Sequence, residues 1–124
     1  MLAMVMAEVR RIGRTTLWSW QGWAAAWRTQ KSLKQWTIVN VISAALALWL
    51  PLSPAERALI LALGILVLAA EVMNTAVETV VDYISTDHHP LAGRAKDCGS
   101  AAVALTAIAG GVVWIVLGWG LWTG

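Results

Sequence analysis

The chain has 124 residues, of which 59% are apolar and 13% are charged, so its length suits one domain and its composition excludes an ordinary soluble one. The net charge of +2 is too small to indicate a nucleic-acid partner, and a lone Cys98 excludes an intrachain disulfide or a cysteine metal cluster. Nine Trp, one Tyr and no Phe are typical of rings placed at a membrane surface. We expect one all-α membrane domain over residues 1–124.

The amino-terminal segment, about 7–34, predicts an amphipathic helix lying in the membrane interface. Trp20, Trp23 and Trp27 fall on one helical stripe, and basic residues are spread along the same segment. An amphipathic helix packed on protein is the alternative, and it would gain little from so many Trp. The apolar run before it is too short for a signal peptide, so we expect no cleavage.

Two transmembrane helices are expected next, over about 35–51 and about 57–84. The first is short for a span unless Lys34 snorkels at its end. The start of the second is marked by Ser53-Pro54-Ala55-Glu56, which combines an N-cap serine, a proline at the first helical position and a glutamate three residues after the cap.

A third transmembrane helix is expected over about 90–122, after a break at Ser85 to His89 and a helix-opening Pro90. The positive-inside rule then places the amino terminus and the second connection in the cytoplasm, and the carboxyl terminus outside. Arg57 alone lies on the outer side. The inner basic residues are Arg10, Arg11, Arg14, Arg28, Lys31, Lys34, Arg94 and Lys96.

An acidic row, Glu71, Asn74, Glu78 and Asp82, occupies the inner half of the second span. Its steps of 3, 4 and 4 keep the four side chains on one helical face. A carboxylate at depth costs roughly 2.5–3.5 kcal/mol on insertion scales, so such residues usually mark a site. Three spans cannot enclose the row with protein, and the sequence therefore also predicts an oligomer.

An antiparallel hairpin of the second and third spans brings further polar residues to this row. Turning near Asp87, it places Lys96 level with Glu78 and Ser100 near Asn74. Mg²⁺ takes oxygen ligands and is often held by one or two carboxylates with substrate phosphates, which Glu78 could supply. Low dielectric favours protonation of a carboxylate such as Glu71, which suits it to accept a proton from a hydroxyl. These are the parts of a phosphoryl transfer to a lipid alcohol, without a Walker-type or zinc motif.

Two stretches make a family resemblance specific: Glu71-Val-Met-Asn-Thr-Ala-Val-Glu-Thr-Val-Val-Asp82, and His89 to Asp97 with its Lys-Asp pair. Together they resemble the E-x-x-N-(S/T)-A-x-E-x-x-x-D pattern and K-D pair of the small integral-membrane bacterial diacylglycerol kinases. The similarity extends from about Arg11 to Trp122. It implies a surface helix with three transmembrane helices in the bacterial inner membrane, a homotrimer with active sites between protomers, and phosphorylation of diacylglycerol to phosphatidic acid by magnesium ATP.

The resemblance also implies residue roles. Glu71 would accept the proton of the lipid hydroxyl, with Asn74 and Asp82 in the same polar site, and Glu78 would bind the metal ion. Contacts to ATP would come from Arg11, Trp18, Gln30, Glu78, Asp87, His89, Lys96 and Asp97. The lipid substrate would lie near Trp49, Arg57, Glu71 and Ser100.

Two positions depart from the family pattern. Gln30 stands where the family usually has a second metal-binding glutamate, so it keeps a carbonyl oxygen and loses a charge. Trp18 stands where a tyrosine usually approaches the nucleotide, so it can stack but has no hydroxyl. A catalytically inactive assembly subunit is therefore one competing interpretation.

The residues themselves allow further interpretations. A polyprenol such as undecaprenol is the nearest alternative substrate, and a small oligomeric proton-coupled transporter or channel is the alternative of another class. Glu71 could be a protonated structural carboxyl, and Arg11 could bind lipid phosphates in place of ATP. Lys96 and Asp97 could be a solvated helix start, and His89 an ordinary loop histidine.

Overall fold

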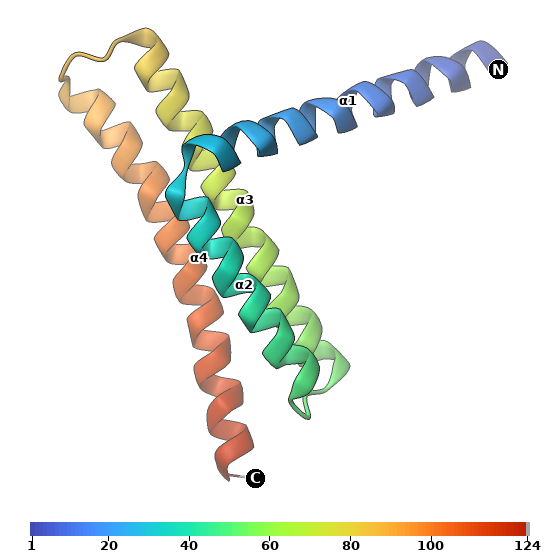
Figure 1. Ribbon diagram of the computed structural model, residues 1–124, viewed down its shortest axis with the longest axis vertical. Helices are drawn as coiled ribbons and strands as arrows, with labels where there is room; N and C mark the ends of the chain where they lie inside the picture. The colour runs from blue at the N-terminus through green and yellow to red at the C-terminus, as the bar shows by residue number, and fades with distance from the viewer. Residues whose placement is uncertain (124) are drawn as a thin grey trace.

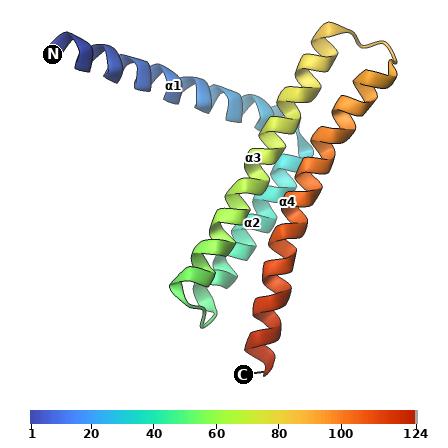
Figure 2. The same ribbon diagram turned by 180° about the vertical axis from the view of Figure 1, so that it is seen from behind.

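The computed structural model describes residues 1–123, which form four α-helices: α1 (Leu2–Thr29), α2 (Lys31–Trp49), α3 (Pro54–Ile84) and α4 (Pro90–Thr123). The helices α2, α3 and α4 run side by side, whereas α1 projects away from them (Figures 1 and 2). No strand occurs within these residues, so the all-α prediction is confirmed.

The central helix of the bundle is α3, which packs against α2 on one side and α4 on another. A small apolar core of Ala47, Leu52 and Ile60 closes the end of the bundle where α2 turns into α3, and Trp114 of α4 packs against it. Helix α3 is therefore in contact with both of the other bundle helices. Any site on its inner face is within reach of both neighbours.

Two helices, α3 and α4, are long and apolar enough to cross a membrane. With α2 beside them they leave large apolar side chains such as Ile65, Leu105 and Ile115 on the surface, as expected for a protein whose solvent is lipid. The 19 residues of α2 include Lys31 and Lys34 in its first turn. It runs alongside α3 (Figure 1), and its role as a further span stays a prediction.

The surface helix expected over about 7–34 has different bounds in the structure. It begins at Leu2 and ends at Thr29, because Gln30 takes an extended conformation with φ −104° and ψ 118°. Lys31 and Lys34 consequently belong to α2. The break changes the direction of the chain from the projecting α1 to the bundle (Figure 1).

The expected start of α3 is visible as a complete capping box. The Ser53 amide donates to Glu56 Oε2 at 2.7 Å, and the Glu56 amide donates to Ser53 Oγ at 3.3 Å. Helix α3 therefore begins at Pro54, three residues before the expected bound. Arg57 closes the other side of the turn, donating from Nε to the carbonyl of Ala47 at 2.8 Å and from a terminal nitrogen to that of Leu50 at 3.3 Å.

Candidate active site

The acidic row of α3 faces the start of α2. Ser32 Oγ donates to Glu71 Oε2 at 2.9 Å, and Gln30 Nε2 donates to Glu78 Oε2 at 3.0 Å. These two bonds tie the α1–α2 junction to the inner half of α3. Glu71 and Glu78 therefore face protein within one chain.

Glu71 is the buried carboxylate of the site, with 3% of its surface exposed. Its single side-chain hydrogen bond within the described chain comes from the neutral Ser32 hydroxyl at Oε2. A hydroxyl satisfies one oxygen without adding a charge, and the second oxygen is left to accept a proton. The group is therefore suited to a general base.

Glu78 accepts a hydrogen bond on each carboxylate oxygen, and both donors are carboxamides. Gln30 binds Oε2, while Asn74, one turn earlier on α3, donates from Nδ2 to Oε1 at 3.2 Å. The two amides approach from different elements. They fix the carboxylate plane more firmly than either could alone, and they add no compensating charge.

A second group of charged residues lies nearer the α3–α4 loop. Lys96 Nζ donates to Asp82 Oδ1 at 2.6 Å, and both side chains are substantially exposed. These two residues line an open pocket together with Asp87 and His89. Four of the predicted site residues are therefore neighbours, at one end of the acidic row.

Lys96 contacts a different residue from the one expected, although the register of α3 and α4 agrees with the predicted hairpin. The expected hairpin places Lys96 level with Glu78, but in the structure its ammonium reaches Asp82, one turn nearer the loop. A long lysine side chain extends toward water, so its contact lies beyond the level of its own Cα. The residue of α4 that contacts Asn74 is Gly99, next to the expected Ser100.

The remaining predicted residues do not join these clusters within one chain. Arg11 and Trp18 are exposed on the projecting α1, where Arg11 pairs with Glu8. Trp49 is 81% exposed and lies with Arg57 at the α2–α3 turn, at the opposite end of the bundle from the α3–α4 loop (Figure 1). Two further residues are exposed on α4: Asp97 and Ser100.

Ser32 was absent from the predicted site, although a sequence signal for it existed. Ser32, Trp36, Asn40 and Ser43 follow one another at steps of 4, 4 and 3 along α2, the same helical spacing that identified the acidic row. Three of these residues contact α3 or α4 through polar atoms. Polar residues at helical spacing within an apolar segment mark its protein-facing side.

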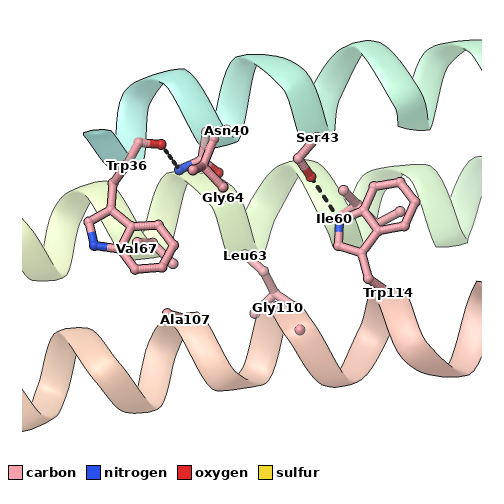
Figure 3. Close-up of a pocket in the computed structure, with 12 residues that line it drawn as sticks. Trp36, Asn40, Ser43, Ile60, Leu63, Gly64, Val67, Ala107, Gly110 and Trp114 are labelled. Carbon is pink, nitrogen blue, oxygen red and sulfur yellow. Dashed lines mark hydrogen bonds between the residues drawn. The ribbon is translucent and has the colours of Figure 1, made fainter. Parts of the chain in front are cut away.

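A pocket between α2, α3 and α4 lies further along the bundle (Figure 3). Asn40 Nδ2 donates to the Trp36 carbonyl and Trp114 Nε1 donates to Ser43 Oγ, both at 2.8 Å (Figure 3). Its lining is mainly apolar and contains none of the predicted site residues. The Trp114–Ser43 bond joins α4 to α2, whereas the Asn40–Trp36 bond lies within α2, and neither adds a titratable group.

The oxygen atoms that could act as metal ligands around Glu78 suit a hard cation. Residues 1–123 contain no cluster of three or more His, Cys, Asp or Glu side chains able to hold a metal ion. Glu78 offers its carboxylate and Gln30 its carboxamide oxygen, whereas the Asn74 Oδ1 atom lies against Gly99, buried without a hydrogen-bond partner in that part of the chain. One carboxylate with neutral oxygens fits a Mg²⁺ ion that phosphates also coordinate.

Comparison with known proteins agrees with this chemistry. Residues 17–117 match the family described as prokaryotic diacylglycerol kinase. The chain is 37% identical over 109 residues to a diacylglycerol kinase of Escherichia coli strain K12, covering 88% of this chain and 89% of the relative. It is 41% identical over 111 residues to one of Pseudomonas aeruginosa PAO1, with the same coverage, and 38% identical over 100 residues to one of Haemophilus influenzae, covering 81% and 85%.

Proposed function

The chain belongs to the prokaryotic diacylglycerol kinase family, and on that premise we propose that it transfers the γ-phosphate of ATP to the free hydroxyl of membrane diacylglycerol, forming phosphatidic acid. It is an enzyme, and the kinase interpretation replaces the transporter or channel considered from the sequence. The observation that carries the assignment of the site is the buried Glu71, hydrogen-bonded to Ser32 on the inner face of the bundle.

Glu71 acts as the general base in this proposal. As the lipid oxygen attacks the γ-phosphorus, its proton passes to the Glu71 carboxylate, and the bond between that phosphorus and the ADP oxygen breaks. Ser32 keeps Oε2 engaged and directs the free oxygen toward the substrate. A positioned base typically contributes about 10²–10⁴-fold to such a reaction.

Glu78, with the carboxamide oxygen of Gln30, would hold the magnesium ion. When bound, this ion neutralises charge on the transferring phosphate. Lys96 lies next to Asp82 in the pocket near the loop, where its ammonium would bind the polyphosphate and His89 the nucleotide. The ATP site would thus lie on the loop side of Glu71, and the lipid would approach from the membrane.

The same proposal includes an arrangement in the membrane. We place the protein in the bacterial inner membrane with the α3–α4 loop and the amino terminus in the cytoplasm, as the basic residues favour. Because Arg11 and Trp18 lie on a helix that leaves its own bundle, we propose that they complete the site of another copy in a homotrimer.

Labelled-lipid formation tests the function. We expect the purified chain in mixed micelles to transfer ³²P from [γ-³²P]ATP to dioleoylglycerol in the presence of Mg²⁺, and to label undecaprenol more weakly. Glu71→Gln should lower kcat by about 10²–10⁴-fold, the usual contribution of a general base. Glu56→Gln is the matched control, since it neutralises a glutamate of the same helix, and a glutamine still completes a capping box.

Two outcomes would contradict the proposal. Labelling of no lipid alcohol by the wild-type protein would remove the kinase activity itself. Normal turnover by Glu71→Gln, with the protein folded as judged by its thermal unfolding, would remove Glu71 from the role of base while leaving the activity in place.

A further inference from the structure

Two asparagines in the bundle make the same contact with a glycine on the next helix. Asn40 of α2 places its carboxamide oxygen against Gly64 of α3, and Asn74 of α3 places its own against Gly99 of α4. A Cβ atom at either glycine would overlap that oxygen and lie 3.2 Å from the carboxamide carbon. Figure 3 shows the first pair, with Asn40 directly beside Gly64. The close approach of oxygen and glycine recurs at both helix interfaces.

The second pair lies in the site. Asn74 Oδ1 is buried and has no hydrogen-bond donor within the described chain, while Nδ2 of the same group donates to Glu78 Oε1 at 3.2 Å. Leaving a buried carbonyl oxygen unpaired costs free energy, so an orientation that directed Oδ1 to a donor would be preferred if one were available. The oxygen instead occupies the space that Gly99 leaves open, and the amide nitrogen points at Glu78.

We propose that Gly99 is a positioning residue for the kinase reaction. Having no side chain, it seats the Asn74 carboxamide in the one orientation that directs Nδ2 at Glu78, and so holds the Glu78 carboxylate toward the metal-bound phosphates. This inference rests on the proposed role of Glu78 at the metal. Gly99 itself touches neither substrate nor metal.

The packing around Gly99 leaves the Asn74 side chain as the group that must yield. The Cα of Asn74 lies 3.6 Å from the position a Cβ at residue 99 would take, which is an ordinary van der Waals contact, so the overlap falls on the Asn74 carboxamide and not on its backbone. Gly99→Ala would therefore rotate the Asn74 side chain and break its bond to Glu78. Glu78 would then keep the bond from Gln30 and lose the one within its own helix.

The Asn40–Gly64 pair supplies a matched control. Gly64→Ala introduces the same overlap at the other helix interface, and Asn40 donates to the Trp36 carbonyl rather than to a site residue. If Gly99 served helix packing alone, the two alanine variants would have the same consequences. If it positions Asn74, the variants differ in binding of the metal–nucleotide complex.

The test measures Mn²⁺–ADP binding by the loss of the free Mn²⁺ EPR signal, together with thermal unfolding in detergent and the KM for dioleoylglycerol. We expect Gly99→Ala to weaken Mn²⁺–ADP binding about tenfold, the change expected for one lost hydrogen bond to a charged group, with the lipid KM unchanged. Gly64→Ala should bind Mn²⁺–ADP as the wild type does, although both variants lower the unfolding temperature. Once Asn74→Ala is present, Gly99→Ala should weaken binding no further, because both changes remove the same bond.

Wild-type Mn²⁺–ADP binding by Gly99→Ala, or an equal loss in Gly64→Ala, would overturn the inference. A Glu78→Gln variant separates this result from a failure of its premise. If Glu78→Gln binds Mn²⁺–ADP normally, both the proposed metal role of Glu78 and the inference are wrong. If Glu78→Gln loses binding and Gly99→Ala does not, the inference alone is wrong.

Discussion

The hydrogen-bond partners along the acidic row change with position. Glu71, the buried member, accepts a hydrogen bond from the Ser32 hydroxyl. Glu78 accepts hydrogen bonds from two carboxamides. Only Asp82, which is exposed, pairs with a cation, Lys96. Burying an ion pair carries a desolvation penalty that Coulomb attraction often fails to offset, whereas a neutral donor satisfies a buried carboxylate at lower cost. Glu71 thus has no counter-ion within the described chain, which suits the proposed role of a base that takes up and releases a proton.

Ser32→Ala tests this interpretation at Glu71. We expect kcat for diacylglycerol phosphorylation to fall about two- to tenfold, because one hydrogen bond worth about 0.5–1.5 kcal/mol no longer orients the carboxylate. Ser32→Thr keeps the hydroxyl and is the control. Steady-state kinetics in mixed micelles measures both variants, and an unchanged kcat in Ser32→Ala would show that the hydroxyl has no part in orienting Glu71.

Gln30→Glu tests whether this position belongs to the proposed magnesium site. The new carboxylate would lie beside Glu78 Oε2, where the amide now donates at 3.0 Å. Without a cation the two carboxylates repel, and with Mg²⁺ both can coordinate it. We therefore expect the variant to require less Mg²⁺ for half-maximal activity, and to unfold at a lower temperature in EDTA than in Mg²⁺. Gln30→Ala is the control, and a magnesium titration of Gln30→Glu identical to that of the wild type would remove this position from the metal site.

At the scale of the helices, side-chain hydrogen bonds stabilise the turn between α2 and α3 at the end of one helix and at the start of the next. The capping box satisfies the first amides of α3, and Arg57 satisfies two carbonyls at the end of α2. The Ala47 carbonyl would otherwise remain unpaired at the end of the helix, whereas the Leu50 carbonyl also accepts from the Leu52 amide at 2.8 Å. The side chain that the family resemblance placed near the lipid therefore has a structural contact as well.

Arg57→Lys distinguishes these two roles. Lysine keeps the charge but lacks the planar group that reaches Ala47 and Leu50 together. We expect the variant to unfold at a lower temperature, by an amount equivalent to about 1 kcal/mol for a lost hydrogen bond, and to keep the wild-type KM for dioleoylglycerol. A raised KM with unchanged thermal unfolding would assign Arg57 to the lipid site. Scanning calorimetry and kinetics on one preparation measure both quantities.

Sequence patterns predicted the elements better than the contacts between them. The capping box at Ser53 is local, and so is the helical spacing of the acidic row, which explains why the start of α3 and its inner face could be anticipated. The break at Gln30 could not be, because its side chain binds Glu78, 48 residues away. The partner of Lys96 depended on how far a flexible side chain extends, which spacing does not encode.

At the scale of the whole molecule, one chain buries little of its own apolar surface. Few residues are buried within positions 1–123, and of these α4 contributes only Val103. Lipid can cover the apolar outer faces, but it cannot replace Arg11 and Trp18 in the ATP contacts proposed for them. Those two residues project away on α1 from the bundle that holds Glu71 and Glu78 (Figure 2).

Mixing two inactive variants tests whether one site draws on two copies. Glu71→Gln lacks the base, and Arg11→Ala/Trp18→Ala lacks the groups on α1. If a neighbouring copy supplies α1 in a closed ring, random assembly of equal amounts leaves roughly one quarter of the sites with both sets intact. We therefore expect co-refolded protein to recover roughly a quarter of wild-type activity. Mixing the variants after separate folding, without subunit exchange, is the control and should recover none. Recovery of no activity after co-refolding, with oligomers of wild-type mass, would mean that each chain builds its site from its own α1.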